Sequence, residues 1–76
     1  MNTATKEPKN LMDGLFSEMN RVRELIKDYE DPILNGAGAF GAYFMKQSIA
    51  QAEKSIRDND IIAMLVAYKS LQEHTG

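Results

Sequence analysis

Cysteine is absent from this 76-residue chain, and histidine occurs once, at His74. Without cysteine the protein has no disulfide bond, no thiolate nucleophile and no zinc site that needs sulfur ligands. A single histidine near the C-terminus does not provide a cluster of metal ligands either, so we expect neither a metal nor another cofactor.

The chain also lacks a long hydrophobic run. Its longest uncharged stretches, residues 32–45 and 61–68, are too short to span a bilayer. The first ten residues are polar and lack the apolar region of a signal peptide. We therefore expect a cytoplasmic protein that does not enter a membrane.

The chain also lacks a large excess of positive or negative charge. Nine Lys and Arg residues stand against eleven Asp and Glu residues, which gives a net charge of -2. Such a balance produces no strong field toward nucleic acid or anionic lipid.

The small size of the chain has its own consequence for stability. A domain this short buries about 60% of the surface that its unfolded chain exposes, and natural domains of this size gain stability from disulfides, metals or partner subunits. Because the first two are excluded here, we expect self-association, most simply as a homodimer.

Apolar residues recur at helical spacing in the first half of the chain. Steps of three and four residues predict an amphipathic helix at about 10–30, after an N-terminal tail at 1–9 that we expect to be flexible. Pro32 ends this helix, because the residue before a proline is disfavoured in the α region. The apolar seam consists of Met12, Leu15, Met19, Val22, Ile26 and Tyr29.

The same spacing predicts two more helices, at about 39–57 and 60–73, separated by the turn-forming residues 58–60. So short a connection favours an antiparallel hairpin. We therefore predict an all-α fold, a single domain at 10–76 with a long first helix followed by a helical hairpin, assembling into a dimeric bundle. Between Glu53 and Arg57 we expect an ion pair within one helix.

Three glycines form the string Gly36-Ala37-Gly38-Ala39-Phe40-Gly41, which has the spacing of a dinucleotide-binding motif. That motif requires a preceding strand and a βαβ unit, and neither is predicted here. We interpret the glycines as residues that allow a turn and a close approach of two helices. Binding of an anion at this turn stays open.

No set of residues indicates catalysis. We expect no histidine close enough to act as a base for any of the serines at positions 17, 48, 55 and 70, and His74 lies where chain ends commonly fray. We predict no catalytic residues, no small-molecule substrate and no enzymatic activity.

The sequence instead predicts a protein-interaction module whose partner is a second copy or another protein. The apolar residues of the second and third helices are too widely spread around each helix to face one neighbour. The predicted interface consists of Phe40, Tyr43, Phe44, Ile61, Ile62, Leu65 and Val66. The alternative is a small nucleic-acid-binding regulator that uses Arg21, Arg23 and Lys27, although the charge balance makes nucleic acid the less favoured partner.

Overall fold

The computed structural model describes residues 11–75. Within this range the chain forms three α-helices and no strand: α1 (Leu11–Tyr29), α2 (Ala39–Arg57) and α3 (Ile61–Gln72), with a short 3-10 helix, η2 (Pro32–Leu34), between α1 and α2. The predicted all-α class with three helices is confirmed. The predicted tail at 1–9 lies outside the described residues, and dimeric assembly stays a prediction.

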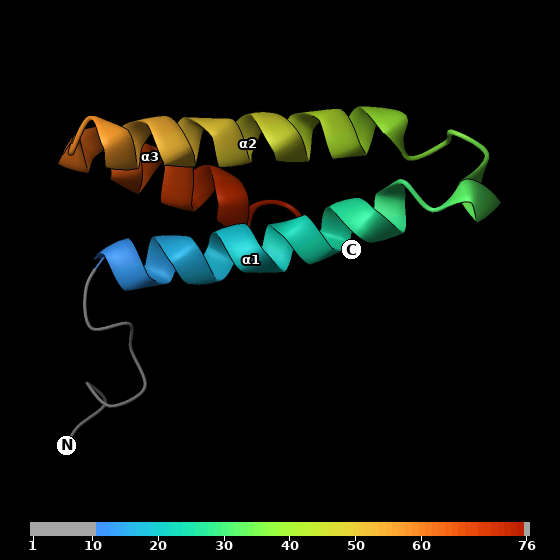
Figure 1. The fold of residues 1–76 in the computed structure, drawn as a ribbon, viewed down its shortest axis with the longest axis horizontal. Coiled ribbons are helices and arrows are strands. Elements are labelled where there is room, and N and C mark those ends of the chain that lie inside the picture. Colours follow the sequence, from blue (N-terminus) through green and yellow to red (C-terminus); the bar gives the residue numbers. More distant parts are fainter. Residues whose placement is uncertain (1–10, 76) are drawn as a thin grey trace, which may run out of the picture.

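The helices run up, down and up, so that α2 is antiparallel to both α1 and α3 (Figure 1). Each helix contacts the other two. The apolar seam of α1 packs on the hairpin of its own chain: Leu15, Met19, Val22 and Ile26 are buried, while Met12 and Tyr29 are partly buried. From the hairpin, the core takes Ala42, Met45, Ile49, Ala52, Met64, Ala67 and Leu71.

The connection between α2 and α3 is a tight helix stop followed by a helix start. Asn59 adopts the left-handed conformation with φ 51°, and the amide of Asp60 donates to the carbonyl of Ser55 at 3.0 Å. This is the Schellman arrangement, in which asparagine can stand where glycine is most common. Asp60 then caps α3, because its carboxylate accepts from the Ala63 amide at 3.1 Å.

The connection between α1 and α2 brings Tyr29 against the glycine string. Gly36 has a positive φ of 86°, and a Cβ atom at Gly38 would overlap the Tyr29 carbonyl. At Gly41 a Cβ atom would lie 2.5 Å from the Tyr29 ring. The interpretation of these glycines as residues for a turn and a close helix approach is therefore confirmed.

Candidate interaction surface

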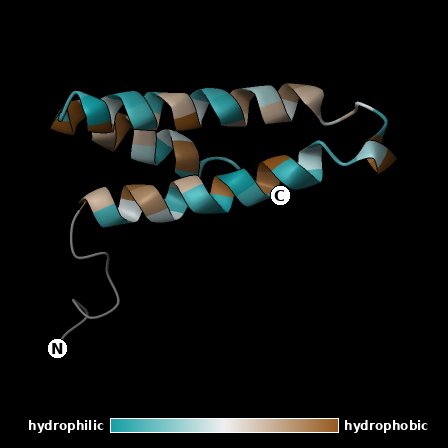
Figure 2. Cartoon of the chain, viewed as in Figure 1, coloured by the Kyte–Doolittle hydropathy of each residue, from teal (hydrophilic) through white to brown (hydrophobic). Residues whose placement is uncertain are grey.

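The exposed side of α3 carries aliphatic side chains, and this surface is called the outer face of α3 below. It consists of Ile61, Ile62, Leu65 and Val66, whose exposed fractions are 55, 71, 51 and 62%. At about 100° per residue these four positions centre about 160° away from the buried residues of the same helix. Figure 2 shows the apolar colouring at the start of α3. Helix α3 is therefore apolar on two opposite sides, of which the core covers one.

A second exposed group, called the aromatic cluster below, lies in the first turns of α2. Phe40 is 82% exposed, Tyr43 55% and Phe44 57%. The rings of Tyr43 and Phe44 meet edge to face, with centroids 5.4 Å apart. Farther along the same side, α2 presents the exposed Gln47 and Gln51. The apolar character of this side is thus confined to one end of the helix.

The structure places the two groups at opposite ends of the helical hairpin. The aromatic cluster is at the start of α2, beside the connection from α1, whereas the outer face of α3 begins where α2 ends (Figure 1). All seven predicted interface residues are exposed in this chain. They form two separate surfaces and not one.

Three large apolar residues within 11–75 are exposed but were not among the predicted interface positions. Ile33 and Leu34 of η2 are 85 and 40% exposed, and Phe16 of α1 is 47% exposed. Ile33 follows Pro32 in the connection between α1 and α2. Pro32 marks this connection in the sequence, so it could have indicated that Ile33 lies outside the helices and is exposed.

The three cations of the alternative nucleic-acid surface are all engaged with other groups. Arg21 pairs with Glu18 at 3.0 Å and Lys27 pairs with Glu24 at 3.1 Å. Arg23 reaches across to Glu53 of α2 at 3.3 Å. The expectation of an ion pair between Glu53 and Arg57 is therefore wrong, because Glu53 pairs with Arg23 of α1. The carboxylates beside these cations weaken the local positive potential that nucleic acid requires.

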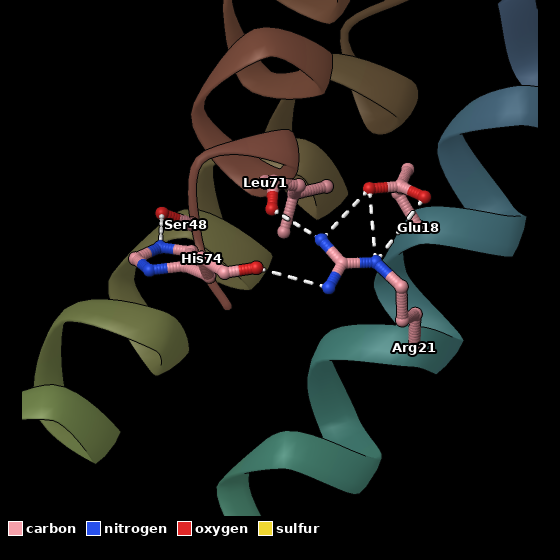
Figure 3. A network of polar contacts seen from close by, with 5 residues as sticks. All are labelled: Glu18, Arg21, Ser48, Leu71 and His74. Atoms are coloured by element: carbon pink, nitrogen blue, oxygen red, sulfur yellow. Dashed lines mark hydrogen bonds and ion pairs between the residues drawn. The ribbon is translucent and has the colours of Figure 1, made fainter. Parts of the chain in front are cut away.

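Arg21 has a further role at the C-terminal end of α3. Its guanidinium donates to the carbonyl of Leu71 at 2.9 Å and to the carbonyl of His74 at 2.9 Å (Figure 3). The last carbonyls of a helix have no partner within the helix, and a nearby cation also suits the negative end of the helix dipole. Arg21 therefore fastens the end of α3 to α1.

His74 lies beside a serine that is distant in sequence. Its Nε2 is 2.8 Å from Ser48 Oγ (Figure 3). Ser48 Oγ is also 2.8 Å from Ser70 Oγ. The expectation that no serine meets the histidine is therefore wrong, because the helical hairpin brings residues 48 and 74 together. Ser48 is only 5% exposed, so the contact links the chain end to α2 and does not present a hydroxyl to solvent.

A groove between α2 and α3 adjoins the outer face of α3. It has a volume of about 350 Å³, and Val66 lines it together with Lys54, Asp58 and Asp60. Lys54 donates to Asp58 at 2.7 Å. This hydrogen bond and the positive charge of Lys54 lower the pKa of the Asp58 carboxyl below its ordinary value of 3.8. The groove thus combines an apolar wall with an ionised carboxylate at its edge.

A larger open pocket of about 590 Å³ lies beside the connection from α1 to α2. Tyr29, Glu30, Tyr43 and Lys46 contribute to its wall, and Lys46 pairs with Glu30. Across residues 11–75 no group of His, Asp or Glu residues is arranged to hold a metal ion. In the same range no helix combines the length and the apolarity needed to cross a membrane.

Comparison of the chain with models of protein families, with curated proteins and with solved structures gave no match.

Proposed function

We propose that this protein is a non-catalytic interaction module that binds a protein partner through exposed apolar helix surfaces. The observation that carries the proposal is the two-sided apolarity of α3. Met64, Ala67 and Leu71 are at most 1% exposed, while Ile61, Ile62, Leu65 and Val66 on the opposite side are all more than half exposed. A helix that is apolar all round is normally covered all round.

The aromatic cluster supports the same function. Aromatic side chains are enriched in protein interfaces, where they supply large apolar area with few rotatable bonds. Phe40, Tyr43 and Phe44 are more than half exposed at the first turns of α2. The partner in this proposal is a second copy of the chain or another protein. The location that we propose is the cytoplasm, as expected from the sequence.

The alternative of nucleic-acid binding has less support from the geometry. Arg21, Arg23 and Lys27 each pair with a carboxylate, and Arg21 also binds two main-chain carbonyls. A protein that neutralised phosphates with these residues would first have to break those contacts. Duplex binding that strengthens steeply as the salt concentration falls would favour this alternative.

Site-specific photo-crosslinking tests the proposed function. A photoreactive amino acid would replace Ile62 or Phe44 in separate variants, and two exposed polar residues of α1, Asn20 and Asp28, would serve as controls outside both surfaces. We expect discrete cross-linked protein products from positions 62 and 44 in the cells that make the protein, and weaker ones from the controls. Equal labelling at all four positions, or none, would count against the proposal.

A further inference from the structure

Four features of the molecule bear on binding: the open pocket beside Lys46, the Ser48–His74 contact, the aromatic cluster and the outer face of α3. The pocket holds no buried unpartnered polar group, and the serine hydroxyl is enclosed. For the aromatic cluster nothing indicates what covers it. Only the outer face of α3 carries features that identify its own partner.

The four aliphatic residues of this face are symmetric about one point on the helix. That point lies midway between residues 63 and 64: Ile62 and Leu65 are equally far from it, and so are Ile61 and Val66. When two copies of such a helix pack antiparallel about a two-fold axis through this point, Ile61 lies level with Val66 of the other copy and Ile62 level with Leu65. Every apolar side chain then meets an apolar side chain, as an isologous contact requires.

The charges at the two ends of the face favour the same orientation. Asp58 and Asp60 precede α3, and Lys69 is exposed on the outer side toward its C-terminal end. Antiparallel packing brings Lys69 of one copy toward Asp58 and Asp60 of the other, whose charges Lys54 and Arg57 partly offset. Parallel packing would instead set Lys69 beside Lys69 and align the helix dipoles. Asp58 keeps 49% of its side chain exposed beside Lys54, so it is accessible to a second cation.

We propose that the outer face of α3 binds the same face of a second copy. The two helices pack antiparallel, and the two-fold axis crosses this face at the level midway between residues 63 and 64. This inference rests on the proposed function and names its partner. Standard protein interfaces bury about 800 Å² on each partner. The outer face of α3 offers four partly exposed aliphatic side chains on each copy, so we expect a smaller contact and a dissociation constant on the order of micromolar.

Sedimentation velocity over a concentration series tests the surface. The variant Ile62→Glu places a carboxylate on the outer face of α3, while Phe40→Glu makes the same kind of change at a side chain that is even more exposed. We expect Ile62→Glu to raise the dimer dissociation constant at least about 30-fold, as for a central interface residue, and Phe40→Glu to leave it nearly unchanged. Circular dichroism should show the same helix content for both variants.

The orientation is tested by a spin label. The chain has no cysteine, so Gln72→Cys creates a unique attachment point at the exposed end of α3. From the helical rise of about 1.5 Å per residue, two labelled backbones should lie about 25 Å apart or more in the antiparallel dimer and about 10 Å apart in a parallel one. The short distance would overturn the proposed orientation.

The remaining outcomes separate this inference from the proposed function. A wild-type chain that stays monomeric at high micromolar concentration overturns the dimer, as does a dimer that Phe40→Glu dissociates and Ile62→Glu does not. If such a monomer still cross-links to a different protein from position 62, the proposed interaction function stands and only the second-copy inference fails.

Discussion

The ring of Tyr29 lies so close to Gly41 that a Cβ atom at residue 41 would be 2.5 Å from two of the ring carbons. The same tyrosine donates its hydroxyl hydrogen to the carbonyl of Thr75 at 2.8 Å. One side chain thus joins the end of α1, the start of α2 and the C-terminal segment. The absence of a side chain at Gly41 is a packing requirement of this arrangement.

The effect of a Gly41 substitution on the free energy of unfolding should change sign with the residue at position 29. With Tyr29 present, Gly41→Ala should lower the free energy of unfolding by about 1–2 kcal/mol, because overpacking outweighs the better helix propensity of alanine. In a Tyr29→Ala background the same change should raise it by up to about 1 kcal/mol. Urea denaturation of the four proteins measures this cycle. Equal effects in both backgrounds would show that the ring does not set the requirement for glycine.

Arg21 should contribute to stability through geometry as well as charge. Arg21→Lys keeps the positive charge but cannot reach Glu18 and two carbonyls at once, so we expect the free energy of unfolding to fall by about 1–2 kcal/mol. The amides of residues 73–75 should exchange with deuterium faster. Arg23→Lys is the matched control, because the contacts of Arg23 with Glu53 and Asn20 are both exposed, and its effect should stay within about 0.5 kcal/mol. Equal losses for the two variants would argue against fastening by Arg21.

The cap of α3 offers a test of the connection between α2 and α3. Asp60→Ala removes the acceptor of the Ala63 amide and should lower the free energy of unfolding by about 1 kcal/mol. Asp60→Asn retains an acceptor oxygen and should cost much less. Thermal unfolding followed by circular dichroism distinguishes the two. A similar loss for both variants would indicate that the carboxylate charge, and not the cap, is what stabilises α3.

The carboxyl group of Asp58 should make the stability of the fold depend weakly on pH in the acidic range. Lys54 lowers its pKa in the folded protein, so the resulting stabilisation is present above the ordinary value of 3.8 and is lost as the pH falls through the lowered pKa. NMR titration of the Asp58 carboxyl should show this lowered pKa, and Lys54→Gln should raise it toward 3.8. A titration curve that Lys54→Gln does not move would contradict the assignment to Lys54.

Much of the fold was predictable because it depends on local patterns. Steps of three and four residues identified the helices, Pro32 identified the end of α1, and the polar residues 58–60 identified the hairpin connection. The exposed residues of α3 could also be recognised, because the eight apolar residues at 61–68 cannot all face one side of a helix.

The contacts between distant residues were not predictable in this way. Arg21 and the carbonyl of His74 are 53 positions apart, and Tyr29 and the carbonyl of Thr75 are 46 apart. Ser48 meets His74 only because the hairpin sets the two helices in a particular register. Helical spacing states which side of a helix is apolar, but it does not state which residue of another helix lies opposite. For the same reason the sequence did not show that the predicted interface would separate into two surfaces.

The most direct test of the central claim is a dilution series monitored by the methyl resonances of Ile61, Ile62, Leu65 and Val66. If the outer face of α3 binds a second copy, these resonances should shift together as the concentration falls from high to low micromolar, while the buried methyl groups of Leu15 and Leu71 stay nearly constant. Resonances of the outer face that do not change with concentration, or shifts confined to the surroundings of Phe40 and Phe44, would contradict self-association through α3.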